Sequence, residues 1–491
     1  MENVDIVVVG AGFGGLGMAT RLARHTDKEF VVLERGEDVG GTWRDNHYPG
    51  AACDVPSHLY SFSFRPKPDW SRLYAPQQEI LEYLQDTVRE EGLLDRIRLR
   101  TELLEARWSP EDRAWTIRTN RGTLRAAVLI SAVGHLSEPR LPEIDGLEDF
   151  GGDLFHSAAW PEDVELGGRR VGVIGSGATA VQVVPQIAED TSRLVVFQRS
   201  APWITPRRDR PYAEAEKRMF ARMPAALEAE RAEIFWTNEE RYAQRRGTPH
   251  LVEAVTRAAL DHLHRQVEDP ELVRRLTPDY TLGCKRVLRS DDYYPALARP
   301  HVVLETDGIE RVVPEGVLTR GSTLHELDVL VACTGFEATD LPISYRVQGT
   351  GGQRLSDAWA DGMRALGTTS VHGFPNLWVV NGPNTGLGHN SAVYIAESQI
   401  ARILDALEHM EAHGIEVLEA DAGAEEQFMA EVERMAQGTV WLEGGCRSWY
   451  VDRRNGRLTT LWPESAYSFR RVNGRFDPAR YRQPAGQPVP R

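Results

Sequence analysis

The stretch Ile6-Val7-Val8-Val9-Gly10-Ala11-Gly12-Phe13-Gly14-Gly15 decides the fold, because an apolar strand runs there directly into a glycine-rich turn. The next apolar run, residues 30–33, ends at Glu34, which lies 24 residues after Gly10. A strand, a tight turn and a helix N-terminus offer unpaired N–H groups and a positive dipole end to a pyrophosphate. A carboxylate at the end of the second strand accepts hydrogen bonds from ribose hydroxyls. The stretch therefore predicts a unit that binds a dinucleotide.

The same design recurs 165 residues later, followed by the opposite charge. Residues 171–174 lead into Gly175-Ser176-Gly177-Ala178-Thr179-Ala180, and the apolar run 194–198 ends at Arg199, again 24 residues after the first glycine of its loop. A guanidinium at this position suits the 2′-phosphate of NADPH. One such loop is weak support, because glycine clusters also serve helix packing, but two complete units predict two dinucleotides. By analogy with other two-site enzymes, we expect FAD in the first unit and NADPH in the second.

Composition narrows the class of protein. The chain has 491 residues, more than one ordinary core holds, and 26% of them are charged, as is typical of a soluble globular protein. Its net charge of −15 argues against nucleic acid as a partner. No apolar stretch approaches the roughly 20 residues of a membrane span, and no secretory signal precedes the first strand. We therefore expect a cytoplasmic protein without a membrane span.

The four cysteines, Cys53, Cys284, Cys333 and Cys446, are scattered and form no C-x-x-C pair. We therefore predict neither a metal site nor a redox disulfide, and the absence counts against the disulfide reductases, which also carry two dinucleotide domains. Cys53 is a poor nucleophile, because the adjacent carboxylate of Asp54 disfavours the thiolate.

Patterning along the chain predicts an α/β fold with two Rossmann-like domains and a helical insertion in the NADPH domain. From residue 212 to 276, apolar residues recur at intervals of three and four, which indicates helices. Proline and glycine at 137–152 indicate a linker. The predicted boundaries are 1–145 and 346–484 for the FAD domain, 146–160 for the linker, 161–208 and 280–345 for the NADPH domain, 209–279 for the insertion and 485–491 for a disordered tail.

The linker carries a longer motif, F-x-G-x-x-x-H-x-x-x-W-P, with Phe150, Gly152, His156, Trp160 and Pro161 at its fixed positions. It resembles the fingerprint of the type I Baeyer–Villiger monooxygenases, relatives of the flavin-containing monooxygenases. The resemblance extends from the first glycine loop to about residue 462 and implies FAD, NADPH and O₂ as reactants. It also implies oxygen insertion beside a ketone carbonyl, through a C4a-peroxyflavin, to give an ester or lactone.

A second signature of the family resembles the stretch Gly40-Gly41-Thr42-Trp43, Tyr48-Pro49-Gly50 and Asp54. Lys285-Arg286 match the Lys-Arg pair that follows the helical insertion in that family. The resemblance implies that Arg286 stabilises the flavin peroxide and the negatively charged adduct, since arginine stays charged and donates several directed hydrogen bonds. It implies that Asp54 orients Arg286, and that Lys285 joins Arg199 and Ser200 around the 2′-phosphate.

Less specific matches complete the predicted site. The glycine-rich turn before the helix expected at 391–410 would receive the flavin's pyrimidine edge, and Trp449 resembles a family tryptophan near the nicotinamide. The predicted cofactor contacts are Gly10, Gly12, Gly15, Glu34, Arg35, Gly41, Thr42, Trp43, Asp54, Gly175, Gly177, Ala178, Thr179, Arg199, Ser200, Lys285, Asn384 and Leu387.

Other interpretations stay open at this stage. His156 could be a base, because imidazole titrates near neutrality, but the family assigns it to coupling domain motion with cofactor binding. Trp43 and Trp160 could be packing residues, and Lys285-Arg286 could form a solvated basic face. The alternative function is heteroatom (N- or S-) oxygenation, which needs no arginine over the flavin, and a third is a non-catalytic redox sensor. The expected partners are a ketone and O₂, and the sequence specifies neither the ketone nor the oligomeric state.

Overall fold

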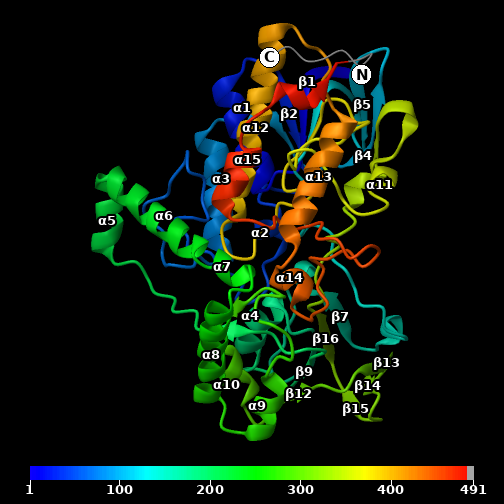
Figure 1. The fold of residues 1–491 in the computed structure, drawn as a ribbon. Coiled ribbons are helices and arrows are strands. Elements are labelled where there is room, and N and C mark those ends of the chain that lie inside the picture. The colour runs from blue at the N-terminus through cyan, green and yellow to red at the C-terminus, as the bar shows by residue number, and fades with distance from the viewer. Residues whose placement is uncertain (484–491) are drawn as a thin grey trace.

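The computed structural model describes residues 1–483 and contains two large sheets, the first mixed and the second all parallel, each with its own helices. Figure 1 shows the first sheet in the upper part of the molecule, together with the N-terminal and C-terminal segments, and the second sheet in the lower part. The predicted disordered tail at 485–491 lies outside the described residues. The predicted α/β fold with two Rossmann-like domains is confirmed.

The first sheet is built around β1 (Glu2–Val9), which lies parallel between β2 (Phe30–Leu33) and β6 (Gly122–Ser131). Its strand order is β17-β4-β5-β6-β1-β2-β3, and β18 pairs with β6. β2 is buried throughout, and β1 and β6 are buried over their last four residues, because these stretches are almost entirely apolar. The other strands are β3 (Ile97–Arg98), β4 (Leu103–Ser109), β5 (Ala114–Thr119), β17 (Val347–Gln348) and β18 (Leu377–Val379).

Helix α1 (Phe13–His25) follows the first glycine loop and packs against α12 (Ala392–His413). The sequence predicted α12 at 391–410, and Ser391 is its N-cap, with its hydroxyl accepting from the Val393 N–H at 3.2 Å. Helix α3 (Gln77–Glu90) also packs on α1. Together these helices cover one face of the first sheet.

The second sheet has five parallel strands in the order β12-β9-β8-β16-β7. Its central strand β8 precedes the second glycine loop, as β1 precedes the first, and α4 (Ala178–Ile187) follows that loop. Part of the predicted linker, Asp153–His156, forms β7 at the edge of this sheet. The remaining strands are β8 (Arg170–Ile174), β9 (Arg193–Phe197), β12 (Val302–Glu305) and β16 (Val329–Ala332), and the three-stranded meander β13 (Ile309–Val313), β14 (Gly316–Thr319) and β15 (Leu324–Glu326) packs beside it.

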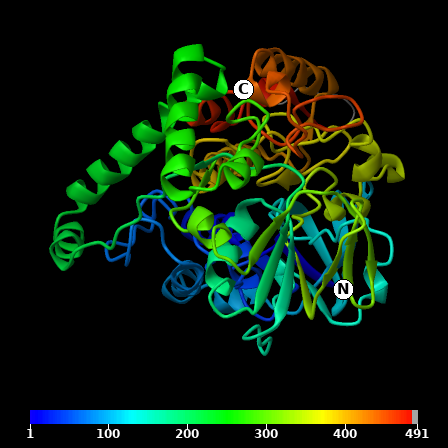
Figure 2. The same ribbon diagram turned by 90° about the horizontal axis from the view of Figure 1, so that it is seen from below.

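The insertion is helical, as predicted, but its helices divide between the two halves of the molecule. Helices α5 (Glu214–Arg222) and α6 (Pro224–Glu239) project sideways and pack on the core of the first half through residues such as Phe220 and Phe235 (Figures 1 and 2). Leu263, on α8, packs in the core of the second half. The other helices of the insertion are α7 (Tyr242–Arg245), α8 (Pro249–Gln266) and α9 (Pro270–Leu276).

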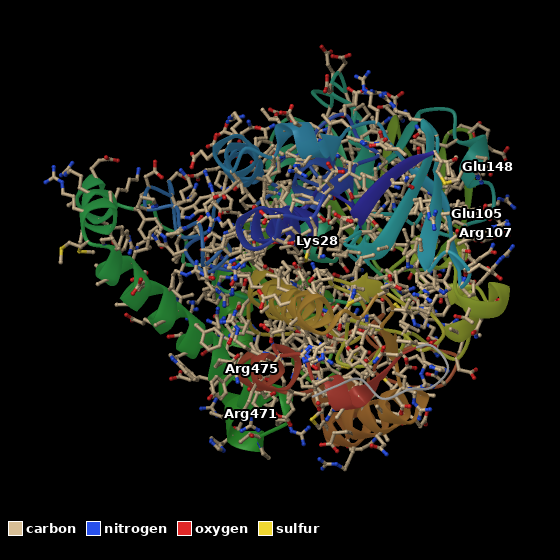
Figure 3. All side chains as sticks on the ribbon, turned by 90° about the horizontal axis from the view of Figure 1, so that it is seen from above. Lys28, Glu105, Arg107, Glu148, Arg471 and Arg475 are labelled. Carbon is tan, nitrogen blue, oxygen red and sulfur yellow. A yellow bond between two sulfur atoms is a disulfide. The ribbon has the colours of Figure 1, made fainter. Side chains whose placement is uncertain are left out.

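Charged side chains cover the outer surface (Figure 3). Glu105 and Arg107 lie two residues apart on β4, so they share one face of the strand, and their side chains form an ion pair at 2.7 Å. Among the helices within residues 1–483, none combines the length and apolar character that a membrane crossing requires. The remaining helices and strands are α2 (Thr42–Asp45), α10 (Tyr293–Leu297), α11 (Leu355–Ala358), α13 (Ala422–Ala436), α14 (Val440–Glu443), α15 (Ala466–Asn473), β10 (Ile204–Thr205), β11 (Leu288–Arg289), β19 (Glu419–Ala420) and β20 (Tyr481–Arg482).

Candidate active site

The first glycine loop is a close-packed turn between β1 and α1. Gly10 has φ +100°, a left-handed conformation that favours glycine, and a Cβ there would stand 2.8 Å from the carbonyl oxygen of Ala132. A Cβ on Gly15 would overlap the Gly10 carbonyl oxygen. No described side chain caps α1 at Gly12, so the first N–H groups of the helix are available to a pyrophosphate.

Glu34, the predicted ribose contact, organises this loop. Its carboxylate accepts from the N–H of Ala11 at 2.9 Å, from the N–H of Gly36 at 2.7 Å and from Arg44 Nη1 at 2.8 Å. An ionised carboxylate offers about four lone-pair sites, so capacity remains for a ribose hydroxyl. Arg44 was missed by sequence reasoning, although it directly follows the Gly40–Trp43 signature.

A cavity of about 280 Å³ opens in front of this loop. The signature loop reaches it as well: Gly41 has φ +52°, and a Cβ there would stand 3.1 Å from the Cα of Gly12, so backbone meets backbone closely. Trp43 forms a wall and donates from Nε1 to the Tyr60 hydroxyl at 3.2 Å. Glycine-lined backbone, an uncapped helix and a ribose carboxylate fit FAD. Of the predicted contacts, the cavity is lined by Gly10, Gly12, Glu34, Arg35, Gly41, Thr42 and Trp43.

Two other predicted contacts are placed differently. Asn384 is buried, and its side-chain amide donates to the carbonyls of Leu458 at 2.7 Å and Leu461 at 3.0 Å, so it shapes the turn. Leu387 is buried in the core. Neither borders the cavity, which is lined instead by Thr385 and Gly386 of the same turn.

The second glycine loop is more open. Gly175 has φ +120°, but a Cβ on Gly177 would meet nothing within 4 Å, and no described side chain caps α4. The first turn of that helix, Ala178 and Thr179, therefore presents free N–H groups in the way the first loop does. This arrangement fits the pyrophosphate of a second dinucleotide.

Arg199, Ser200 and Lys285, the predicted 2′-phosphate contacts, line one pocket near this loop. Lys285 Nζ donates to the Ser200 hydroxyl at 2.7 Å and lies 4.7 Å from the centre of the Tyr280 ring. Burial, and then the charge of Arg199, lower the pKa of Lys285. Two cations that repel each other across a small pocket fit an anion such as the 2′-phosphate of NADPH.

Asp54 and Arg286 form a two-pronged ion pair. Arg286 Nε donates to Asp54 Oδ2 at 2.8 Å, and Nη2 donates to Oδ1 at 2.6 Å. The charge of Asp54 raises the pKa of Arg286. Burial alone would raise the pKa of Asp54, but the charge and hydrogen bonds of Arg286 outweigh it and hold this pKa below its ordinary value. The pair is therefore ionised throughout the neutral range.

The loop that carries Asp54 joins the two halves. Tyr48 donates its hydroxyl to Gln182 Oε1 on α4 at 2.9 Å, and Gln182 Nε2 donates to the carbonyl of Ala52 at 2.9 Å. His47 Nε2 lies 2.8 Å from the carbonyl oxygen of Trp160, so the fingerprint segment contacts the same loop. The two signatures, more than 100 residues apart in sequence, meet at one junction.

The fingerprint residues occupy packing positions. Trp160 is buried and packs edge-on against Phe155, with ring centres 5.1 Å apart. His156 Nδ1 accepts from the Ala158 N–H at 3.1 Å, and burial lowers the pKa of His156, so its ring is neutral. It packs on Phe336, which follows β16, at 5.7 Å. These contacts favour a structural or coupling role over general-base catalysis.

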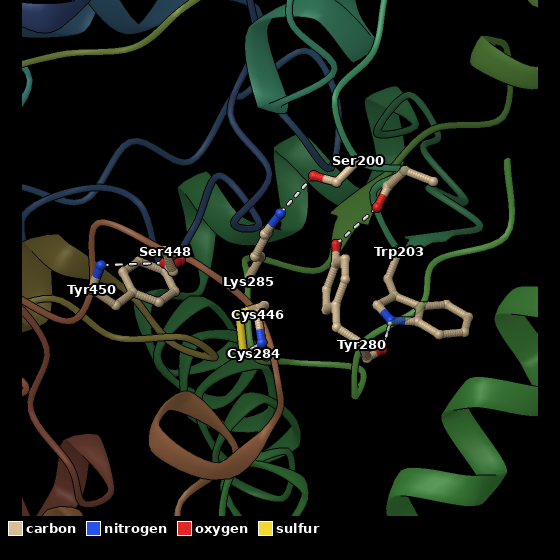
Figure 4. The surroundings of a disulfide bond; sticks show 9 residues. Ser200, Trp203, Tyr280, Cys284, Lys285, Cys446, Ser448 and Tyr450 are labelled. Atoms are coloured by element: carbon tan, nitrogen blue, oxygen red, sulfur yellow. Dashed lines mark hydrogen bonds between the residues drawn. A yellow bond between two sulfur atoms is a disulfide. The ribbon is translucent and has the colours of Figure 1, made fainter. Parts of the chain in front are cut away.

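The sequence predicted no redox disulfide of the C-x-x-C kind, and it did not anticipate a long-range disulfide. Cys284 and Cys446 are bonded to each other across 162 residues of sequence, and Figure 4 shows the bond beside Lys285. The absence of C-x-x-C excludes only local pairs, whereas this bond depends on how the C-terminal segment folds back. Trp449, on that segment, is 46% exposed and packs edge-on against Tyr450. Cys53 and Cys333 are free and buried, and residues 1–483 hold no cluster suited to a metal ion.

Sequence reasoning also missed Arg245 on α7. Its Nη2 donates to the Gly388 carbonyl at 2.8 Å, while Nε and Nη1 are buried with no hydrogen-bond partner among the described residues. Burial lowers the pKa of Arg245 to about 10. A Cβ on Gly388 would stand 3.0 Å from Arg245 Nε, so a buried positive charge lies directly against the turn that precedes α12. Its sequence context, rich in arginine and glutamate, is that of a solvated helix.

Two dinucleotide pockets joined by a charged junction define a class of oxidoreductases that pass electrons from a nicotinamide to a flavin. The family described as "Pyridine nucleotide-disulphide oxidoreductase" matches residues 7–234. A Baeyer–Villiger monooxygenase of Streptomyces coelicolor is 43% identical over 98% of this chain and 92% of its own length. One of Pseudomonas aeruginosa is 42% identical over 98% and 91%. The closed crystal structure of cyclohexanone monooxygenase superposes with a TM-score of 0.86, at 29% identity over 96% of this chain and 97% of that one.

The chain belongs to the Baeyer–Villiger monooxygenase family. The predicted family, enzyme class and cofactors are thereby confirmed: the chain is a monooxygenase that depends on FAD and NADPH. A related structure, described as OTEMO in complex with FAD and NADP, has a TM-score of 0.85 at 28% identity over 95% of this chain and 96% of that one. The roles of individual residues in this chain stay predictions.

Proposed function

We propose that this chain converts a ketone to an ester or lactone, with Arg286 as the catalytic cation and Asp54 as its positioning residue. The observation that carries the proposal is the two-pronged Asp54–Arg286 pair, in which the carboxylate comes from the signature loop of the first half and the arginine from the second. When bound, FAD and NADPH supply the electrons that activate O₂ for insertion beside the carbonyl.

Arg286 keeps donors free for this task. Its guanidinium has five N–H groups, and Asp54 takes two of them, one from Nε and one from Nη2. The remaining three have no partner among the described residues and can donate to negative charge that develops on the substrate oxygen. The side chain is 44% exposed, so a reacting molecule can reach it.

Asp54 fixes the plane of the guanidinium and balances its charge. A single point contact would leave Arg286 free to rotate, whereas two parallel hydrogen bonds define its orientation. Lys285, next in sequence, reaches Ser200 in the opposite pocket. We therefore propose that one short segment positions NADPH through Lys285 and the reacting carbonyl through Arg286.

The cofactor of the reaction indicates the cellular compartment in which the enzyme works. Enzymes that consume NADPH work where cells regenerate it, and we propose the cytoplasm for this chain. The linear, cyclic or aryl nature of the ketone is set by side chains around Arg286, including those of the helical insertion.

The test is product analysis with FAD-loaded enzyme, NADPH and a panel of linear, cyclic and aryl ketones. Wild-type enzyme should form esters or lactones, and Arg286→Ala should lose about 10²–10³ in rate while it keeps bound FAD. Arg222→Ala, which removes an exposed arginine on α5, serves as the matched control and should behave as wild type. Hydrogen peroxide as the only product with every ketone, or ketone oxidation by Arg286→Ala at the original rate, would contradict the proposal.

A further inference from the structure

We propose that Arg447 and Arg453 of the C-terminal segment complete the recognition of the NADPH 2′-phosphate, and that the Cys284–Cys446 disulfide holds this segment in place. The inference rests on the proposed placement of that phosphate beside Arg199 and Lys285. It adds two specificity residues and a covalent tether to that site.

The pocket is built from two distant parts of the chain. It has a volume of about 320 Å³ and lies between the second half of the molecule and the segment that follows α14. The second half contributes Arg199, Ser200, Asp279, Tyr280 and Lys285, and the C-terminal segment contributes Gly445, Cys446, Arg447 and Arg453.

The charge of this pocket is strongly positive. Four of its residues are cations and one, Asp279, is an acid. Among residues 1–483, the guanidinium groups of Arg199, Arg447 and Arg453 have no ion-pair partner. Arg454, the next residue, pairs with Asp452 at 2.6 Å and Asp340 at 2.9 Å, so acids are within reach of this segment but do not neutralise the pocket.

A phosphate monoester matches this unpaired charge. It carries about −1.5 to −2 at neutral pH and has three acceptor oxygens, which suit several cations at once. The 2′-phosphate is the feature that distinguishes NADPH from NADH. Cations from both sides of the pocket therefore favour NADPH, whereas the rest of the dinucleotide is common to both cofactors.

The disulfide holds the two sides together beside these cations. Cys284 directly precedes Lys285, and Cys446 directly precedes Arg447, so each half of the bond is one residue from a cation of the pocket. Figure 4 shows the bond between the segment of Lys285, whose side chain reaches Ser200, and the segment that runs to Tyr450. The Thr281 N–H also donates to the Gly444 carbonyl at 2.9 Å.

Opening the bond would loosen the second side of the pocket. A dithiol reductant transfers two electrons, so the S–S bond breaks, each cysteine sulfur becomes a thiol, and the reductant is oxidised to its own disulfide. In a reducing cytoplasm, disulfides of this kind are usually transient. The bond then links the thiol redox state to NADPH affinity, because Arg447 and Arg453 lose their fixed position.

The first experiment measures binding of 2′,5′-ADP and 5′-AMP to the FAD-loaded enzyme by calorimetry. Arg447→Gln and Arg453→Gln should each weaken 2′,5′-ADP about tenfold and leave 5′-AMP unchanged, because only the former has the 2′-phosphate. Arg454→Gln is the matched control and should bind both as wild type does. If Arg199→Gln weakens 2′,5′-ADP while both C-terminal variants do not, this inference fails and the proposed NADPH site stands. If Arg199→Gln has no effect, the proposed site itself fails.

The second experiment tests the tether. Thiol labelling of the denatured, unreduced enzyme should find two free thiols, and labelling after dithiothreitol should find four, since Cys53 and Cys333 are already free. Dithiothreitol should weaken 2′,5′-ADP at least several-fold, the double variant Cys284→Ser/Cys446→Ser should show the same weakening, and dithiothreitol should not weaken that variant further. Four thiols without reductant, or unchanged 2′,5′-ADP binding after full reduction, would overturn the tether.

Discussion

Gly15 and Ala180 close the two glycine loops at the same place in each motif, yet their surroundings differ. A Cβ on Gly15 would overlap the Gly10 carbonyl, whereas the second loop already accommodates the methyl group of Ala180. The residues after the second strands differ in the same way. Glu34 is buried and occupied by three donors, while Arg199 is exposed and has no ion-pair partner within residues 1–483.

We interpret the first loop as a holding site, which keeps its cofactor bound, and the second as an exchange site, whose cofactor binds and leaves. The FAD loop is completed by contacts within the protein, so its geometry exists before the cofactor binds and favours retention. The second loop leaves Arg199 without an ion-pair partner among residues 1–483, which would suit a cofactor that arrives and leaves in each turnover, as we propose for NADPH. The Asp54–Arg286 pair lies between the holding site and the exchange site.

The largest effect should come from alanine in the two loops. Gly15→Ala forces the Cβ into the Gly10 carbonyl, and we expect a loss of about 3 kcal/mol or more in the free energy of unfolding, with no FAD retained. Gly177→Ala has open space and φ −81°, so it should fold and keep FAD but bind NADP⁺ about tenfold more weakly. Thermal melting measures the stability, flavin absorbance measures the retained FAD, and NADP⁺ titration measures the NADP⁺ affinity. Equal losses of stability and FAD in the two variants would contradict the proposed contrast between the two loops.

The next effect separates the two charges that follow the loops. Glu34→Gln leaves Arg44 with Asp45 as its remaining ion-pair partner and removes the carboxylate that holds the loop, and we expect about 2 kcal/mol less stability together with faster loss of FAD. Arg199→Gln changes an exposed residue, so stability should stay within about 0.5 kcal/mol, while the preference for NADPH over NADH falls about tenfold or more. Denaturant unfolding and cofactor-dependent kinetics distinguish them. An Arg199→Gln enzyme that loses FAD would show that the second loop is not independent of the first.

Patterns that are local in sequence predicted most of the fold and the central residues of the candidate site. The strand–glycine–helix units, the 24-residue spacing to Glu34 and Arg199, and the Lys285-Arg286 pair each lie within a short segment, where periodicity and turn chemistry act directly. The expected cofactors followed from the two glycine-loop units, the family followed from the motif at residues 150–161 and the signature at residues 40–54, and the comparisons confirm both.

Features that depend on tertiary approach were missed. The Cys284–Cys446 bond joins segments 162 residues apart, and no spacing rule reports that they meet. Arg245 lies in a segment rich in charge, so its burial against Gly388 is visible only when α7 is packed. Asn384 sits in the predicted flavin turn, but its left-handed φ of +53° turns the side chain to the protein's own carbonyls.

The rate of the enzyme should depend on the charge of Asp54, and pH should not change that dependence in the neutral range. Because Arg286 holds the pKa of Asp54 below its ordinary value, the stability of the pair is present above the ordinary carboxyl range of about 4 and is lost only as pH falls through the lowered pKa. Asp54→Asn should therefore slow ketone oxidation about tenfold. This factor should be the same at every pH from 5.5 to 8.5. Rate profiles of both enzymes measure this ratio. A ratio that varies several-fold inside the window would mean that Asp54 titrates there.

The smallest effect should come from salt, and it sharpens the contrast between the two sites. Exposed charges are screened over about 8 Å at physiological ionic strength and over about 3 Å at 1 M, while buried pairs are screened much less. Arg199 is exposed, so KM for NADPH should rise several-fold between 0.05 and 0.5 M NaCl, and KM for NADH should rise less because it lacks the 2′-phosphate. FAD retention should not change, since Glu34 and Arg44 are only 5% and 18% exposed. Equal salt dependence for NADPH and NADH would place the unpaired cations away from the 2′-phosphate, and release of FAD by salt would remove the distinction between a holding and an exchange site.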